Sequence, residues 1–326
     1  MDLNLLPYQI GIDMIPKIGS INAKRLIAYC GGVEAVFKES KSALIKVPGI
    51  GQVIANEIVN QKVLDRAKCE VDFVLKHNIK TLFYLNDDYP KRLKQCDDGP
   101  IVLFVKAKEN IDFNQQKVIS VVGTRSITDY GKMVCEDIIA QLAERGHNPI
   151  VVSGLAYGVD ICAHRAALKN RIPTIAVLGH GLDTIYPSIH RNTAKEIYEE
   201  GALVTDFPSK TLPDRNNFVK RNRIIAGLSD ATIVVESAEQ GGSLITADIA
   251  VSYNREVFAI PGAVSSKFSK GCNLLIKTNK AALIDSADDI EFQLDWESGN
   301  TQKAAPQLSL FTDLSDDEQV VFDVIK

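Results

Sequence analysis

From Lys117 onward, short apolar runs alternate with longer helical segments. The apolar runs predict six strands, at Val118–Val122, Ile150–Ser153, Thr174–Leu178, Leu203–Asp206, Thr232–Glu236 and Glu256–Ile260. Segments with helical patterns separate most of them, for example Tyr130–Arg145 and Asp160–Leu168. A strand that is apolar along its length is typical of a parallel sheet covered on both faces. The pattern therefore predicts an α/β fold over residues 117–295, with a Rossmann-like, doubly wound, mostly parallel sheet.

A small helical domain is predicted before the sheet, over residues 1–66. Two similar segments, Met14–Ile27 and Leu44–Ile58, each place a proline or glycine turn between apolar helical runs. Pro48–Gly51 resembles the helix-hairpin-helix signature, in which a glycine turn offers backbone N–H groups to a DNA phosphate. Such units also serve only as packing modules, so both roles stay open for this domain.

The remaining segments flank the sheet. Residues 67–116 are predicted to hold the greater part of a connecting helix, Val63–His77, and two extension strands, Thr81–Leu85 and Ile101–Val105. Residues 296–314 are polar and predict a linker. A capping box at Ser315–Glu318 then precedes a predicted helix, Gln319–Lys326, so residues 315–326 are expected to begin a C-terminal helical domain.

Glycine and small hydroxyl residues recur where the predicted strands end. Gly123, Thr124, Arg125 and Ser126 follow the first strand, and Gly241, Gly242 and Ser243 come shortly after the fifth. Ligands of parallel sheets bind beyond the carboxyl ends of the strands, where glycines let N–H groups approach an anion. Each group alone could be a structural turn, but together they predict a phosphate-binding rim.

A basic helix is predicted between the fourth and fifth strands. Asn216 or Asn217 is expected to cap it and Gly227 to end it. Its first turns carry three cations, Lys220, Arg221 and Arg223, and Lys210 stands in the preceding loop.

Cations near a helix N-terminus are disfavoured by the helix dipole, so these charges indicate either a solvated face or a bound anion. Lys220 and Arg223 share a helical face and are the preferred DNA contacts. Arg221 points elsewhere and could instead pair with an internal carboxylate.

Composition limits the functional classes. The chain has 326 residues with a net charge of −4, so any polyanion must meet a local basic patch. The six cysteines form no C-x-x-C pair, which indicates a reducing compartment, and the absence of a long apolar run favours a cytoplasmic protein without a membrane span. No dinucleotide fingerprint or P-loop occurs, and no spacing favours a metal, so no cofactor is expected.

Eight segments carry a resemblance to a known family. They are Val121–Arg125, Val151–Asp160, His164–Leu168, Leu178–Pro187, Phe218–Asp230, Gly241–Ala247, Ile260–Gly262 and Lys270–Ile276. In this combination and order they resemble the DNA-processing protein A (DprA, also Smf) family.

The resemblance implies a single-stranded-DNA-binding protein that loads the recombinase RecA in natural transformation. It also implies a homodimer through the Rossmann-like domain, no cofactor, and a C-terminal winged helix beginning at 315–326. Arg125, the strand-end glycines and Arg221–Arg223 would contact phosphate. The chain departs from the family pattern at Val219, where proline is frequent, and at Ser188, where lysine is frequent. Lys220 could compensate for the missing lysine.

Two other functions and one further motif remain as alternatives. A phosphoribohydrolase-type enzyme would need an acid after Gly241–Gly242, but Asp248 has the wrong spacing, and no nucleophile–base pair is evident near His180 and Asp183. No catalytic residue is therefore expected. A scaffold that binds only proteins is the third class.

Gln307–Phe311 resembles the pentapeptide that docks on the DNA polymerase sliding clamp, so the clamp is a possible partner.

Overall fold

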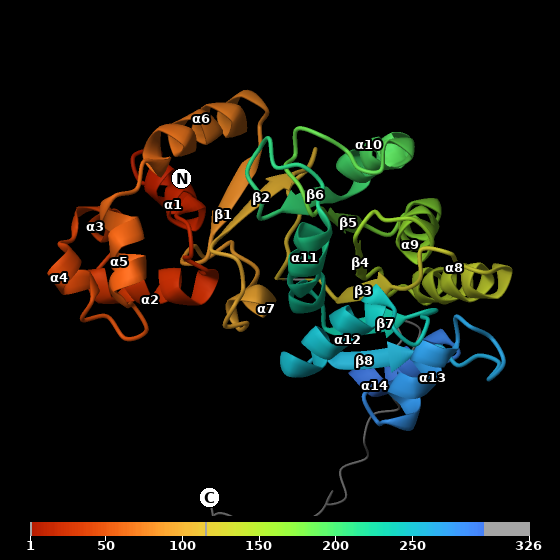
Figure 1. Cartoon of the computed structure of the whole chain (residues 1–326). Helices are drawn as coiled ribbons and strands as arrows, with labels where there is room; N and C mark the ends of the chain where they lie inside the picture. The colour runs from red at the N-terminus through yellow and green to blue at the C-terminus, as the bar shows by residue number, and fades with distance from the viewer. Residues whose placement is uncertain (1, 115, 297–326) are drawn as a thin grey trace, which may run out of the picture.

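The computed structural model describes residues 2–114 and 116–296, which contain one nine-stranded sheet (Figure 1). The strand order is β1-β2-β6-β5-β4-β3-β7-β8-β9. The strands are β1 (Lys80–Phe83), β2 (Val102–Lys106), β3 (Val118–Val122), β4 (Ile150–Ser153), β5 (Thr174–Val177), β6 (Ala202–Thr205), β7 (Ala231–Val234), β8 (Glu256–Ala259) and β9 (Ala282–Leu283). Among the strand pairs of the described residues, only β1–β2 and β2–β6 are antiparallel. The predicted mostly parallel Rossmann-like sheet is confirmed.

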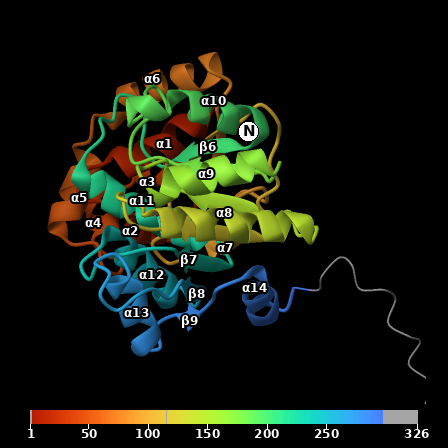
Figure 2. The same cartoon turned by 90° about the vertical axis from the view of Figure 1, so that its right-hand side faces the viewer.

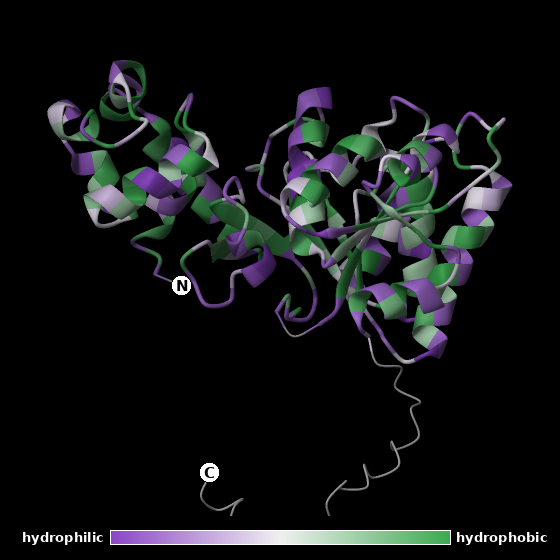
Figure 3. Cartoon of the chain, turned by 90° about the horizontal axis from the view of Figure 1, so that it is seen from below, coloured by the Kyte–Doolittle hydropathy of each residue, from purple (hydrophilic) through white to green (hydrophobic). Residues whose placement is uncertain are grey.

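Helices cover both faces of this sheet. One layer contains α8 (Asp129–Glu144), α9 (Val159–Lys169), α10 (Arg191–Glu200) and α14 (Ala287–Leu294), and Figure 2 shows α8 and α9 side by side across it. The other contains α7 (Lys91–Lys94), α11 (Arg215–Leu228), α12 (Gly242–Ser252) and α13 (Lys270–Lys277). A short 3-10 helix, η1 (Ser188–His190), precedes α10. Apolar side chains of both layers pack on the strands. Figure 3 shows strands of the sheet in the green of hydrophobic residues.

The N-terminal helices share a core with the sheet. They are α1 (Leu6–Met14), α2 (Ser20–Cys30), α3 (Val33–Lys38), α4 (Lys41–Leu44), α5 (Gln52–Val59) and α6 (Val63–Lys76). One apolar cluster runs from Leu6 and Ile10 of α1 to Val102 and Phe104 of β2. The helical segment therefore packs directly on the antiparallel edge of the sheet. The domain boundaries at residues 66, 116 and 295 stay predictions, and the expected C-terminal domain and Gln307–Phe311 lie outside the described residues.

The two similar N-terminal segments have the same turn geometry. Gly49 has φ +83°, and Lys17 at the matching position has φ +66°. Each turn is closed by a backbone hydrogen bond over three residues, from Ile18 to Ile15 and from Ile50 to Val47. Lys17 thus adopts the left-handed conformation that glycine supplies more easily in the second copy.

The ends of α11 differ from the prediction. The N-cap is Asp214, whose carboxylate accepts the Asn216 N–H at 2.8 Å, so the caps expected at Asn216 and Asn217 are wrong. The helix continues past Gly227 to Leu228, so Gly227 does not end it. The glycine instead allows close packing, since a Cβ there would lie 2.6 Å from Cδ2 of Leu93. Strand β9 was not predicted, since two residues are too few to show a pattern.

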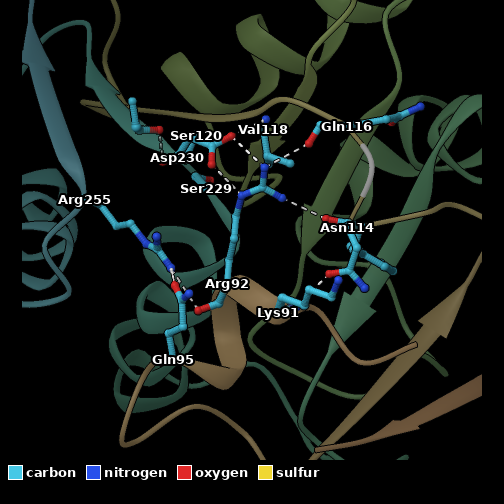
Figure 4. A network of polar contacts seen from close by, with 12 residues as sticks. Lys91, Arg92, Gln95, Asn114, Gln116, Val118, Ser120, Ser229, Asp230 and Arg255 are labelled. Atoms are coloured by element: carbon cyan, nitrogen blue, oxygen red, sulfur yellow. Dashed lines mark hydrogen bonds and ion pairs between the residues drawn. The ribbon is translucent and has the colours of Figure 1, made fainter. Parts of the chain in front are cut away.

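Arg92 ties the connecting segment to the parallel sheet (Figure 4). Its guanidinium binds both carboxylate oxygens of Asp230, at 2.6 and 2.9 Å, and donates to the carbonyls of Phe113 and Gln116. Asp230 also accepts the N–H of Val118 at 2.9 Å. One carboxylate thereby fixes the start of β3, the end of α11 and the position of α7.

We expect Asp230→Asn to lower the free energy of unfolding by about 2–4 kcal/mol, because it leaves the Arg92 guanidinium poorly paired in a half-buried site. Urea denaturation measures the change. The matched control is Asp248→Asn, which breaks an exposed pair with Lys280 and should cost less than about 1 kcal/mol. Equal losses in both variants would contradict the role given to this network.

Candidate nucleic-acid interface

The order in which the chain adds strands to the sheet reverses between the parallel neighbours β3 and β7. After β3 the chain builds β4, β5 and β6 on one side, and then returns to place β7, β8 and β9 on the other. The connections leaving β3 and β7 therefore separate and open a crevice beyond the carboxyl ends, which is the usual ligand position in such folds. A cavity of about 780 Å³ occupies this place. It is lined by the turn after β3, the starts of α9 and α12, and one face of α11.

Arg221 lies at the floor of this cavity and is only 4% exposed. Its NH1 group donates to the carbonyl of Val177 at 2.5 Å. The guanidinium lies against Gly154, where a Cβ would be 1.9 Å from NH1. Among the residues that the structure describes, none offers a hydrogen-bond acceptor to its Nε.

The Arg221 guanidinium keeps its charge at this floor. Burial lowers the pKa of Arg221 to about 10, and the charge of Asp160 opposes that shift, so the guanidinium stays protonated at neutral pH. Asp160 accepts the N–H groups of Gly154 and Ala156, while burial raises its pKa. The buried cation therefore has one nearby carboxylate, an occupied NH1 and an unpartnered Nε.

Arg125 and two aromatic rings form the rim. The Arg125 guanidinium lies 6.0 Å from the centroid of the Phe218 ring. The Phe218 ring stacks on Tyr186 with 5.7 Å between centroids, and Tyr186 is 48% exposed. Gly179 allows this approach, since a Cβ there would lie 2.7 Å from Cδ1 of Phe218. A cation and a partly open aromatic stack thus stand together at the cavity mouth.

The turn that carries Arg125 is held by Glu236. The Glu236 carboxylate accepts both the N–H and the hydroxyl of Thr128, at 2.8 and 2.6 Å. Its backbone carbonyl accepts the Thr124 N–H at 2.7 Å. Because Glu236 is 2% exposed and follows β7, the loops after β3 and β7 are locked to each other.

The N-terminus of α12 forms another wall of the cavity. Gly241 caps the helix with extended backbone, and no side chain caps it within the described chain. Ser243 donates its hydroxyl to Ser237 at 2.9 Å, which fixes the first turn. First-turn N–H groups of a helix without a side-chain cap are available to an anion.

The structure brings seven of the predicted site residues into this cavity. They are Gly123, Thr124, Arg125, Arg221, Gly241, Gly242 and Ser243. The other four do not line it. Ser126 is an exposed neighbour of Arg125, and Lys220 is exposed outside the cavity. The backbone of Lys210 is fixed by Asp183, which accepts its N–H at 2.9 Å.

The preference for Arg223 over Arg221 conflicts with the structure. Arg223 binds the Asp206 carboxylate at 2.6 Å and also donates to the Asp98 carbonyl. Its guanidinium is thus committed to internal partners, whereas Arg221 faces the cavity. The helical spacing correctly separated these two side chains, but only packing decided which face of α11 meets the crevice.

The cavity lining also contains a cation and two aromatic rings that were not among the predicted site residues, namely Arg215, Phe218 and Tyr186. A signal existed: Arg215, Phe218, Asn222 and Ile225 recur at helical spacing and form one stripe of α11. The stripe was hidden because the helix was expected to begin after Arg215. Tyr186 comes from a separate loop, so no spacing in the sequence relates it to Phe218.

The three residues considered for a catalytic role, Asp248, His180 and Asp183, lie apart from the cavity. Asp248 lies on the outer side of α12, where it pairs with Lys280 at 2.8 Å. His180 is buried and donates from Nδ1 to the Gly181 carbonyl, while Asp183 accepts from Lys210. None of these three acids and bases lines the cavity. Within 2–114 and 116–296, no cluster of three or more His, Cys, Asp or Glu could hold a metal, and no helix is long and apolar enough to span a membrane.

Residues 80–295 match the family model described as DNA recombination-mediator protein A. The chain belongs to this DprA/Smf family. It is 33% identical over 308 residues to Protein Smf of Synechocystis sp., covering 92% of this chain and 76% of that protein.

Two solved DprA structures are similar to the fold. The protein from Streptococcus pneumoniae superposes with a TM-score of 0.75 at 30% identity, covering 88% of this chain and 97% of that one. The protein from Helicobacter pylori, whose structure addresses a single-stranded DNA binding mode, gives a TM-score of 0.59 at 28% identity. That match covers 66% of this chain and 95% of the Helicobacter pylori chain.

A buried histidine close enough to feel the charge of Arg221, His164, provides a pH test of this structure. His164 is fully buried, and burial together with the Arg221 charge lowers its pKa from 6.5 to about 3. The Thr174 hydroxyl donates to the Val151 carbonyl, so it must accept a hydrogen bond from Nδ1 of His164. The ring is therefore neutral in the folded protein.

We expect the free energy of unfolding to fall as the pH drops below 6.5. In this range the unfolded chain binds a proton at His164, whereas the folded chain keeps the ring neutral. His164→Gln should reduce the slope of unfolding free energy between about pH 6 and pH 4 by up to about 1.4 kcal/mol per pH unit. Urea titrations across this range measure it. The control is His77→Gln, an exposed position. An unchanged slope in the His164 variant would contradict the buried neutral ring.

Proposed function

We propose that the chain binds single-stranded DNA in the cavity at the β3–β7 switch point and delivers that DNA to the recombinase RecA. The observation that carries the first half is the combination, in one cavity, of cations, a free helix N-terminus and an exposed aromatic stack. Phosphate and base have separate partners there, as in other single-strand sites. The name of the family, a recombination mediator, supports the second half.

Arg125 and Arg215 are the proposed direct phosphate contacts, since both are exposed and line the cavity. Arg221 lies deeper and supplies a free Nε donor at the floor. Backbone N–H groups of Gly123, Thr124 and Gly241–Ser243 add hydrogen bonds to phosphate oxygens. Ser126, Lys210 and Lys220 would act only on DNA that extends beyond the cavity. We assign Arg223 to structure.

Phe218 and Tyr186 are the proposed partners of the bases. Their stacked rings stand at the mouth beside Arg125, so a base that reaches Tyr186 adds to an existing stack. Stacking is tolerant of sequence because every base has an aromatic face. We therefore propose binding with little sequence preference. The family resemblance supports a homodimer through the Rossmann-like part, which we include in the proposal.

A salt series with a single-stranded oligonucleotide tests phosphate binding. Arg125→Ala and Arg215→Ala should each weaken binding about ten-fold at low salt and reduce the slope of log affinity against log salt by about 0.7, one phosphate contact. Arg171→Ala is the matched control, because this exposed arginine lies just before β5, at the amino ends of the parallel strands and away from the cavity. Unchanged affinity and slope in both cavity variants would refute the proposed groove.

Base stacking has a separate test. Phe218→Leu should weaken binding of oligothymidylate about ten-fold, since loss of one stacking partner costs about 1–3 kcal/mol. The same variant should bind an abasic oligonucleotide of equal length as wild type does, because the phosphates are unchanged. Fluorescence anisotropy measures both. Equal losses with the two ligands would show that Phe218 only supports the fold of the cavity.

A further inference from the structure

The loop between β6 and α11 forms one wall of the cavity. It covers residues 206–214, and Pro213, Asp214 and the adjoining Arg215 line the cavity. It contains no helix or strand, and Leu212 is 75% exposed at its surface. A loop of this kind is ordinarily mobile, and ordering it when a ligand binds would reduce affinity.

The helical segment grips this loop at Ser209. Glu70 of α6 is 1% exposed, and its two oxygens accept the N–H and the hydroxyl of Ser209 at 2.8 and 2.5 Å. Arg66, one turn earlier, binds Glu70 at 2.8 Å and donates to the Ser209 carbonyl at 2.6 Å. Every polar group of Ser209 is thus bound by α6.

The other side of the loop is held by the loop that follows β5. Asp183 accepts the Lys210 N–H at 2.9 Å, and the Thr211 carbonyl accepts the Gly181 N–H at 3.1 Å. Gly181 permits this contact, since a Cβ there would lie 2.6 Å from the carbonyl oxygen of Pro208. The loop is therefore pinned from two directions immediately before the residues that enter the cavity.

We propose that α6 holds the 206–214 loop in its DNA-binding conformation, so that Arg66, Glu70 and Ser209 are positioning residues for Arg215. The helical segment then raises DNA affinity without touching DNA. The effect on DNA affinity rests on the proposed function, but the contacts between α6 and the loop exist without DNA. The buried Glu70 carboxylate makes the grip specific, because a buried charge requires its full set of partners.

Limited trypsin digestion without DNA tests the grip. Cleavage after Lys210, which is exposed in this loop, requires the loop to open locally. Glu70→Gln and the milder Ser209→Ala should each speed this cleavage, by about ten-fold for Glu70→Gln. Glu57→Gln is the control, because it removes another carboxylate of the helical segment, one that pairs with Lys17. Cleavage at the wild-type rate in both test variants would overturn the proposal.

Oligonucleotide binding then tests the positioning role. Glu70→Gln should weaken binding about five-fold to ten-fold with an unchanged salt slope, since the bound state keeps its phosphate contacts. In an Arg215→Ala background the same substitution should have a much smaller effect, because the residue it positions is gone.

A general loss of folding would weaken binding equally in both backgrounds and would overturn the positioning role. So would faster cleavage without any loss of affinity. A wild-type protein that binds no oligonucleotide would refute the proposed function itself, and the digestion result would then show separately whether α6 holds the loop.

Discussion

The burial of the Arg221 guanidinium is the constraint on which the cavity depends. A charge in this position must be solvated by the protein, and the surrounding residues do so. The Val177 carbonyl accepts from it, Asp160 balances it, and Gly154 leaves room for it. The same charge helps to keep His164 neutral. One buried cation therefore fixes the ends of β4 and β5, the start of α9 and the face of α11.

The rim differs from the floor, because its loops are fixed by internal contacts while its arginine side chains stay exposed. Glu236 locks the loops after β3 and β7 together, and α6 with Asp183 fixes the loop before α11. The side chains carried by these fixed loops, Arg125 and Arg215, remain exposed. Rigid backbone with free side chains is the arrangement that binds a ligand at low entropic cost. Hydrogen bonds thus connect the helical segment and the sheet to the loops that carry the proposed DNA contacts.

Much of the fold could be predicted because its signals are local. The strand β3 was predicted with its observed bounds, and α8 and α9 within one residue at each end, since runs of β-branched residues and helical periodicity depend only on neighbours in the chain. Seven of the eleven predicted site residues line one cavity, because carboxyl ends of parallel strands must meet at one edge. The cap of α11 was misplaced by two or three residues, which is where local signals are weakest.

The sequence by itself determined the mostly parallel sheet, the edge at which most of the predicted site residues meet, and the family. Only the tertiary structure decided which cations reach that edge. Arg221 and Arg223 are two residues apart on one helix, yet one lies at the cavity floor and the other is bound to Asp206. The pairing of Tyr186 with Phe218, and of Glu70 with Ser209, joins segments far apart in the chain. Such contacts depend on how whole elements pack, and no spacing of residues along the chain encodes them.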